Sequence, residues 1–161
     1  MSKTSKRKLL QEIFDAGEPK HPDDVVGVWV WRLSLAYQRR AEAALKDFDL
    51  THLQFVILAS CARLNLLTGR VSQRDLAADI RMQEAQLSFI VKTLKTKGLI
   101  TQSANSKDGR VRVIEITSAG IRLLAEVLPH VRQFQLEVWP SQKENEKLKK
   151  TIRAILESWG E

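Results

Sequence analysis

Amide, hydroxyl and apolar side chains alternate along the segment 83–97 of this 161-residue chain. Gln86 carries both a hydrogen-bond donor and an acceptor, Ser88 carries a hydroxyl, and Ala85 and Phe89 are apolar. These groups match the edges of bases in the major groove of DNA: glutamine pairs with adenine, serine bonds to a base or a phosphate, and an apolar group meets the thymine methyl. The segment therefore predicts base contacts, provided that a rigid element presents it.

Cationic side chains follow in the same segment and in a later turn. Lys92 and Lys95 are suited to backbone phosphates, which supply most of the affinity for DNA. Arg110 is suited to a minor groove, where Asp108 could hold its guanidinium in place. The alternative is a solvated turn with an incidental ion pair, which contributes little. The candidate DNA contacts are Ser72, Gln83, Ala85, Gln86, Ser88, Phe89, Lys92, Lys95, Lys107, Asp108, Arg110 and Arg112.

The side chains that could support catalysis or bind a metal are scattered. His21, His52 and His130 form no His-x-x-x-His pair, and the chain has neither a glycine-rich phosphate loop nor a metal-ligand cluster. Cys61 lies within an apolar run, where burial favours an inert core thiol; the alternative is a redox sensor. We therefore expect no enzyme activity, no catalytic residue, no metal site and no cofactor.

Two short helices and a hairpin are predicted to present the candidate contacts. Ser72 and Asp75 have the spacing of a capping box at the start of the first helix. The second helix, 83–97, places apolar residues at i, i+3, i+4 and i+7 and ends at Gly98. Two β-rich runs, 99–102 and 111–117, then flank a charged turn. This order is that of a winged helix.

Helices are also predicted on both sides of this core. Pro22 begins a helix that continues to about residue 45, and Thr51 with Gln54 forms a capping box for a buried central helix. After the hairpin, apolar stripes at 124–134 and 148–159 need a cover that one winged helix is too small to supply. We expect a homodimer; the alternative is a monomer whose terminal helices fold back on the core.

Composition limits the class of protein. The net charge of +7 and the pI near 9.8 favour a polyanionic partner. The longest apolar run, 55–62, is far shorter than the ~20 residues needed to span a bilayer, and the N-terminus has no apolar signal segment. With a single cysteine, the pattern predicts a cytoplasmic protein without a membrane partner. Residues 1–21 are either a short helix that packs on a neighbouring subunit or a solvated basic extension.

Several motifs stand in one register and carry a family resemblance. They are Leu50-Thr51 with Gln54 and Leu58, Leu76-Ala77, Leu94 with Lys97-Gly98-Leu99, Asp108-x-Arg110, and Ile116-Thr117 with Gly120. Over residues 25–159 the chain resembles the MarR family of transcriptional regulators. It departs from the family pattern at Arg81, where glycine is usual, at Glu84, and at Phe89, where a basic or polar residue is frequent.

The resemblance implies one mainly α-helical (α+β) winged-helix chain over 1–161. Its DNA-binding part is 50–117, and its dimerisation helices are 22–48 and 118–159. The implied function is sequence-specific binding of double-stranded promoter DNA, as a repressor released by a small-molecule effector. Trp31, Tyr37 and His52 are the candidate effector residues. The alternative function is a winged-helix dimer that serves protein assembly and has no operator of its own.

Overall fold

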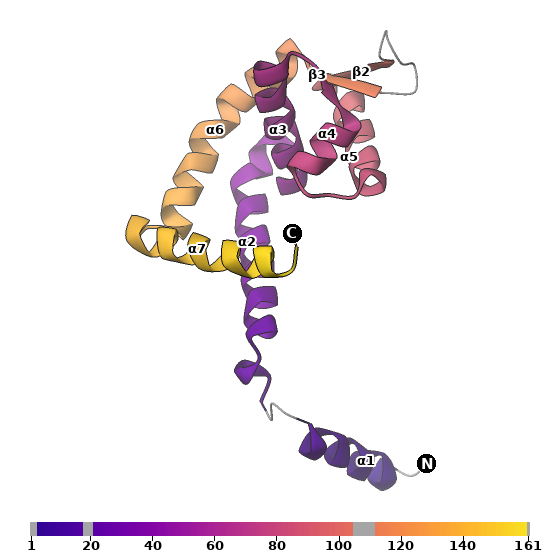
Figure 1. The fold of residues 1–161 in the computed structure, drawn as a ribbon, viewed down its shortest axis with the longest axis vertical. Coiled ribbons are helices and arrows are strands. Elements are labelled where there is room, and N and C mark those ends of the chain that lie inside the picture. Colours follow the sequence, from indigo (N-terminus) through magenta and orange to yellow (C-terminus); the bar gives the residue numbers. More distant parts are fainter. Residues whose placement is uncertain (1–2, 18–20, 105–111, 161) are drawn as a thin grey trace. The chain divides into compact units, whose positions relative to one another are not determined.

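The computed structural model describes residues 3–17, 21–104 and 112–160 (Figure 1). The chain divides into two compact units, Met1–Arg39 and Arg40–Glu161. The helix α2, Val26–Leu45, begins in the first unit and ends in the second. The predicted class, mainly α with a small winged-helix sheet, is confirmed.

The helix α3, His52–Thr68, is the centre of the second unit. It follows a complete capping box between Thr51 and Gln54, as predicted. Its buried side chains include Ile57, Leu58 and Cys61, and α4, α5, α6 and the sheet pack around it (Figure 1). Burial raises the pKa of the Cys61 thiol to about 11, which agrees with the inert core cysteine favoured above.

A three-stranded antiparallel sheet in the order β1-β3-β2 lies against α3. The hairpin strands are β2, Ile100–Ala104, and β3, Arg112–Ile116. The strand β1, Val71–Ser72, was not predicted, because two residues are too few to display an alternating pattern. The Asn65 side chain of α3 donates to the Ile114 carbonyl at 3.1 Å and accepts from the Ile116 amide at 2.7 Å, which holds β3 on the central helix.

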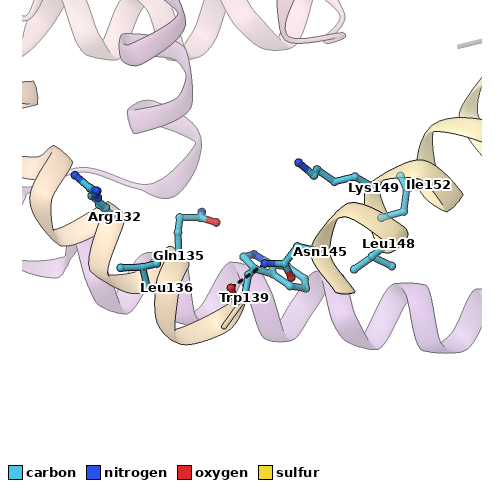
Figure 2. A pocket seen from close by; sticks show the side chains of 8 residues that line it. All are labelled: Arg132, Gln135, Leu136, Trp139, Asn145, Leu148, Lys149 and Ile152. Carbon is cyan, nitrogen blue, oxygen red and sulfur yellow. Dashed lines mark hydrogen bonds between the residues drawn. The ribbon is translucent and has the colours of Figure 1, made fainter. Parts of the chain in front are cut away.

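Two long helices complete the second unit. They are α6, Ser118–Val138, and α7, Gln142–Ser158. Side chains from the end of α6 and the start of α7 line a groove of about 450 Å³ that includes Leu136, Trp139 and Ile152 (Figure 2). The amide of Asn145 donates to the Trp139 carbonyl at 2.8 Å and fixes the turn between the two helices.

The N-terminal end of α6 lies directly on the hairpin. Thr117 caps the helix by accepting from the Gly120 amide, and its own amide donates to the Leu99 carbonyl at 3.1 Å. A Cβ on Gly120 would lie 2.3 Å from that carbonyl oxygen and 2.8 Å from Ile116 Cγ1. Only glycine therefore allows α6 to approach the backbone this closely.

Replacing Gly120 by alanine should lower the free energy of unfolding by about 3 kcal/mol, because backbone atoms would have to move apart. Urea unfolding followed by circular dichroism measures the change. Gly27→Ala is the matched control, since its Cβ would meet no atom closer than 4.0 Å, and it should leave stability unchanged or slightly raised. Equal effects of the two substitutions would contradict this packing.

The first unit contains α1, Lys3–Ala16, a short 3₁₀ turn at Pro22–Asp24, and the start of α2. A short helix is present over α1, and its Leu9, Leu10, Ile13 and Phe14 side chains are exposed; packing of this helix on a neighbouring subunit stays a prediction. The prediction that Pro22 begins the long helix was wrong. Val25 has an extended backbone between the 3₁₀ turn and α2, so the long helix begins at Val26.

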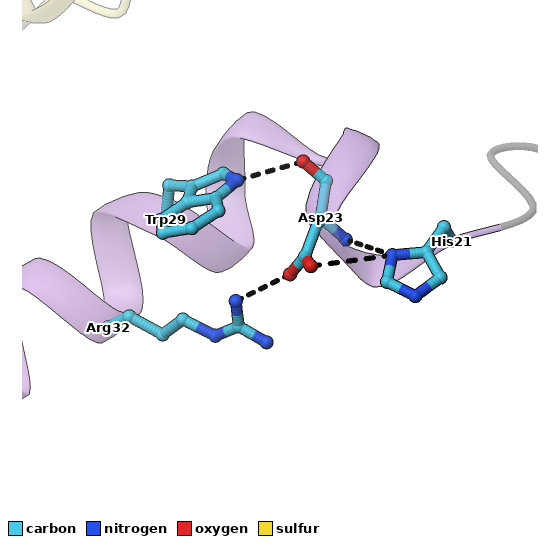
Figure 3. Close-up of polar contacts among 4 residues, drawn as sticks. All are labelled: His21, Asp23, Trp29 and Arg32. Carbon is cyan, nitrogen blue, oxygen red and sulfur yellow. Dashed lines mark hydrogen bonds and ion pairs between the residues drawn. The ribbon is translucent and has the colours of Figure 1, made fainter.

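A polar cluster fixes the 3₁₀ turn to the first turns of α2 (Figure 3). The Asp23 carboxylate pairs with the Arg32 guanidinium at 2.5 Å, and the Asp23 backbone amide donates to the His21 Nδ1 at 3.3 Å. The Trp29 indole donates to the Asp23 carbonyl at 2.8 Å, and the Arg32 guanidinium lies 5.1 Å from the Trp29 ring centroid. These contacts join the 3₁₀ turn to Trp29 and Arg32 of α2.

Among the described residues, no single helix is long and apolar enough to cross a membrane. The bent pair Val26–Phe48 and His52–Thr68 passes a test of length and composition together. A helix buried in a protein core passes the same test, and α3 is such a core helix here.

Candidate nucleic-acid interface

The helices α4, Gln73–Asp79, and α5, Glu84–Thr96, form the predicted helix-turn-helix. The capping box of Ser72 and Asp75 is present at the start of α4, and Leu76 and Ala77 are buried. Arg81, in the turn, has a left-handed backbone with φ of 52°. A side chain in this conformation costs about 1 kcal/mol relative to glycine.

The two faces of α5 are those predicted. Leu87, Val91 and Leu94 are buried, and Ile90 is half-buried. The opposite face is exposed and carries Ala85, Phe89, Lys92 and Thr96. Phe89, a large apolar ring, is 75% exposed on this face.

The remaining candidates on α5 lie at the edges of the exposed face. Gln86 and Lys95 are exposed, and Gln83 is the N-cap residue without a side-chain cap bond. Ser88 is exposed as well, and its hydroxyl donates to the Glu84 carbonyl at 2.9 Å. Glu84 stands in the first turn of α5, where the helix dipole favours a negative charge.

The candidates outside α5 have different surroundings. The Ser72 hydroxyl donates to the Asp75 carboxylate at 2.6 Å, so its proton is already used within the cap. Arg112 is exposed at the start of β3. Lys107, Asp108 and Arg110 lie outside the described residues, and the aspartate-arginine pair stays a prediction.

A carboxylate that sequence reasoning missed fixes α4 on the central helix. Asp79, at the end of α4, accepts from the Ser60 hydroxyl and pairs with the Arg63 guanidinium of α3. The bond from Ser60 and then the bond from Arg63 lower the pKa of Asp79. In the sequence, Ser60 lies 19 residues and Arg63 lies 16 residues before Asp79, so no local motif relates them to it.

The candidate effector residues fall in different units. Trp31 is 62% exposed and Tyr37 is half-buried, both in the first unit. His52, in the second unit, is half-buried. Burial lowers the pKa of its imidazole, and the charge of Glu42 opposes this in part. Their grouping into one site stays a prediction.

No model of a known protein family matches the chain. A relative does: the HTH-type transcriptional regulator YdcH of Bacillus subtilis is 30% identical over 135 residues, which cover 84% of this chain and 92% of YdcH. MarR of Escherichia coli, solved as a mutant in complex with operator DNA, superimposes with a TM-score of 0.74 over 81% of this chain and 93% of MarR. The chain belongs to the MarR family. The resemblance drawn from its motifs is thereby confirmed.

A second solved structure adds to the fold comparison of this MarR-family protein. BpsR of Bordetella bronchiseptica, described for the regulation of its DNA binding by 6-hydroxynicotinic acid, superimposes with a TM-score of 0.76 over 85% of this chain and 96% of BpsR. The sequence identity is 22% for BpsR and 18% for MarR, so these two structures establish the fold alone. YdcH is an HTH-type transcriptional regulator.

Proposed function

We propose that this protein binds double-stranded promoter DNA sequence-specifically and places α5 in the major groove. The observation that carries the proposal is the two-sidedness of α5: Leu87, Val91 and Leu94 are buried, whereas the face with Ala85, Phe89 and Lys92 is open. An α-helix with its side chains is about 10–12 Å in diameter and fits the major groove, which is about 12 Å wide. Gln86 and Phe89 are the proposed base contacts, and Lys92, Lys95 and Arg112 are the proposed phosphate contacts.

We also propose that the protein binds DNA as a homodimer through its terminal helices. Ile152 is 45% exposed, Ile155 is 41% exposed and Trp159 is 72% exposed, all on one stripe of α7 and its C-cap. Beside them, the groove between α6 and α7 has a largely apolar wall of Leu136 and Trp139 (Figure 2). A second copy of the chain would cover both surfaces and present two α5 helices to a two-fold symmetric site.

Repression released by a small molecule is the proposed mode of regulation. A dimer across a promoter would exclude other proteins from it, and BpsR gives a precedent for a fold of this kind whose DNA binding responds to a small acid. Trp31, Tyr37 and His52 are the proposed effector residues. We expect 6-hydroxynicotinic acid, used as a first probe, to release bound DNA and to change tryptophan fluorescence; Trp31→Phe should remove most of the fluorescence change.

The experiment that tests DNA recognition compares Gln86→Ala with Lys92→Ala. Operators are selected from random DNA, and binding to an operator and to a scrambled duplex of equal length is measured by fluorescence anisotropy. Loss of Gln86 should weaken operator binding by roughly 5- to 100-fold and leave scrambled DNA unaffected, because an amide paired with a base contributes ~1–3 kcal/mol only at its own base.

Lys92→Ala is the matched comparison on the same exposed face of α5. It should weaken binding to both duplexes alike and reduce the slope of log affinity against log salt by about 1 for each copy. Equal weakening of both duplexes by Gln86→Ala would contradict its role as a base contact. Failure of the unaltered protein to bind any duplex would favour the assembly module instead.

A further inference from the structure

A chain of hydrogen bonds joins the hairpin to both helices of the helix-turn-helix. The Gln102 amide of β2 donates to the Gln73 side-chain carbonyl oxygen of α4 at 3.3 Å. The Gln73 amide nitrogen in turn donates to the Ser88 hydroxyl oxygen of α5. Ser88 donates its own proton to the Glu84 carbonyl, one turn earlier, at 2.9 Å. We refer to Gln102, Gln73, Ser88 and the Glu84 carbonyl as the Gln-Gln-Ser relay.

The Glu84 carbonyl fixes the direction of every bond in the relay. A carbonyl oxygen only accepts, so the Ser88 hydroxyl must donate to it, and the oxygen of Ser88 must then accept from Gln73. The Gln73 side-chain nitrogen also lies 3.4 Å from the Glu84 carbonyl oxygen. If the Gln73 amide were turned over, its own oxygen would take this place and the Glu84 oxygen would repel it. With its nitrogen on this side, Gln73 presents its oxygen to Gln102.

The relay leaves Ser88 with one free lone pair and no free proton. A hydroxyl has one donor and two acceptor sites, and the relay uses the donor and one acceptor. Ser88 is nevertheless exposed beside the outward face of α5. A phosphate oxygen, guanine N7 and O6, and thymine O4 all require a donor, which Ser88 cannot supply without breaking its bond to Glu84.

We propose that Ser88 reads an exocyclic amino group in the major groove, adenine N6 or cytosine N4, and that Gln73 and Gln102 are positioning residues that fix the orientation of its hydroxyl. The inference rests on the proposed function, since it names the base chemistry that the same helix selects. It replaces the broader sequence expectation that Ser88 serves either a base or a phosphate. It also gives a strand of the hairpin an indirect role in base recognition, because Gln102 belongs to β2 and bonds to Gln73.

The test removes single amino groups from a selected operator. Each adenine is replaced in turn by purine, which lacks the 6-amino group, and each cytosine by 2-pyrimidinone, which lacks the 4-amino group. The full-length protein should lose roughly 5- to 100-fold in affinity at one symmetric pair of positions that depends on Ser88. At that pair, Ser88→Ala should bind the altered and unaltered operators equally.

Gln73→Met tests the positioning residue, because methionine has a similar length and cannot donate to Ser88. It should reduce discrimination at the same base pair several-fold while leaving scrambled-duplex affinity and the melting temperature near their original values. A purely structural role would lower the melting temperature and both affinities together. Gln102→Met should act in the same direction with a smaller effect, because Gln102 contacts Ser88 only through Gln73.

The outcomes separate this inference from the proposed function. If the protein selects an operator but every amino-group deletion affects the unaltered protein and Ser88→Ala equally, the inference is wrong and the proposed function stands. The same holds if Ser88→Ala loses discrimination only at a guanine or thymine. If the unaltered protein shows no sequence preference at all, the proposed function fails and the inference fails with it.

Discussion

Raising the salt concentration from 50 to 200 mM should weaken binding of the dimer to duplex DNA by on the order of 10³-fold, given ~6–10 phosphate contacts. The chain carries a net charge of +7, and Lys92, Lys95 and Arg112 are exposed on α5 and at the start of β3. Each phosphate that such a side chain neutralises releases condensed counterions, and salt opposes that release. Two copies double the number of contacts.

Anisotropy titrations at four or more salt concentrations measure this slope. The operator and a scrambled duplex should give nearly the same slope, because phosphate contacts do not depend on sequence. The difference in affinity between the two duplexes should persist at every salt concentration. A response that stays flat over this range would contradict the proposed interface and favour a dimer used for protein assembly.

Replacing Ile152 and Leu156 together by lysine should raise the dissociation constant of the dimer by at least about 10³-fold, because four ammonium groups would enter an apolar interface. Both residues lie on the stripe of α7 that the proposed second copy covers. Light scattering at micromolar concentration measures the mass. Operator affinity should fall in parallel, since a monomer contacts one half-site only.

A matched control keeps the added charge and changes the face of the helix. Ala154→Lys combined with Glu157→Gln also raises the net charge of α7 by two, at exposed positions away from the stripe. This variant should remain a dimer and bind the operator. If the unaltered chain is a monomer in solution, or if both double variants dissociate equally, the proposed interface is wrong.

The elements that the sequence predicted best are those specified by residues close together in the chain. The capping boxes at Thr51 and Ser72 each depend on a residue three positions later, and both are present. The buried stripe of α5 repeats every three or four residues and was likewise predictable. Such local patterns do not require knowledge of what packs against the element.

The contacts that could not be predicted join residues far apart in the sequence. Asp79 meets Ser60 and Arg63 only because α4 packs on α3, and Gln73 meets Ser88 only because α4 packs on α5. Both contacts depend on the crossing of two helices, which periodicity does not specify. The DNA roles of the site residues are a further step, and they stay predictions until binding is measured.

The close backbone contact at Gly120 makes the junction between α6 and the hairpin rigid. No side chain separates the first turn of this helix from the Leu99 carbonyl, so a rotation of the helix cannot be accommodated by side-chain rearrangement at Gly120. The helix has 21 residues and is therefore about 31 Å long. A tilt of about 5° would move one of its ends by about 3 Å, close to one base-pair step along a duplex. In the proposed dimer, a tilt of α6 by a few degrees would therefore be enough to move the two α5 helices out of register with successive major grooves.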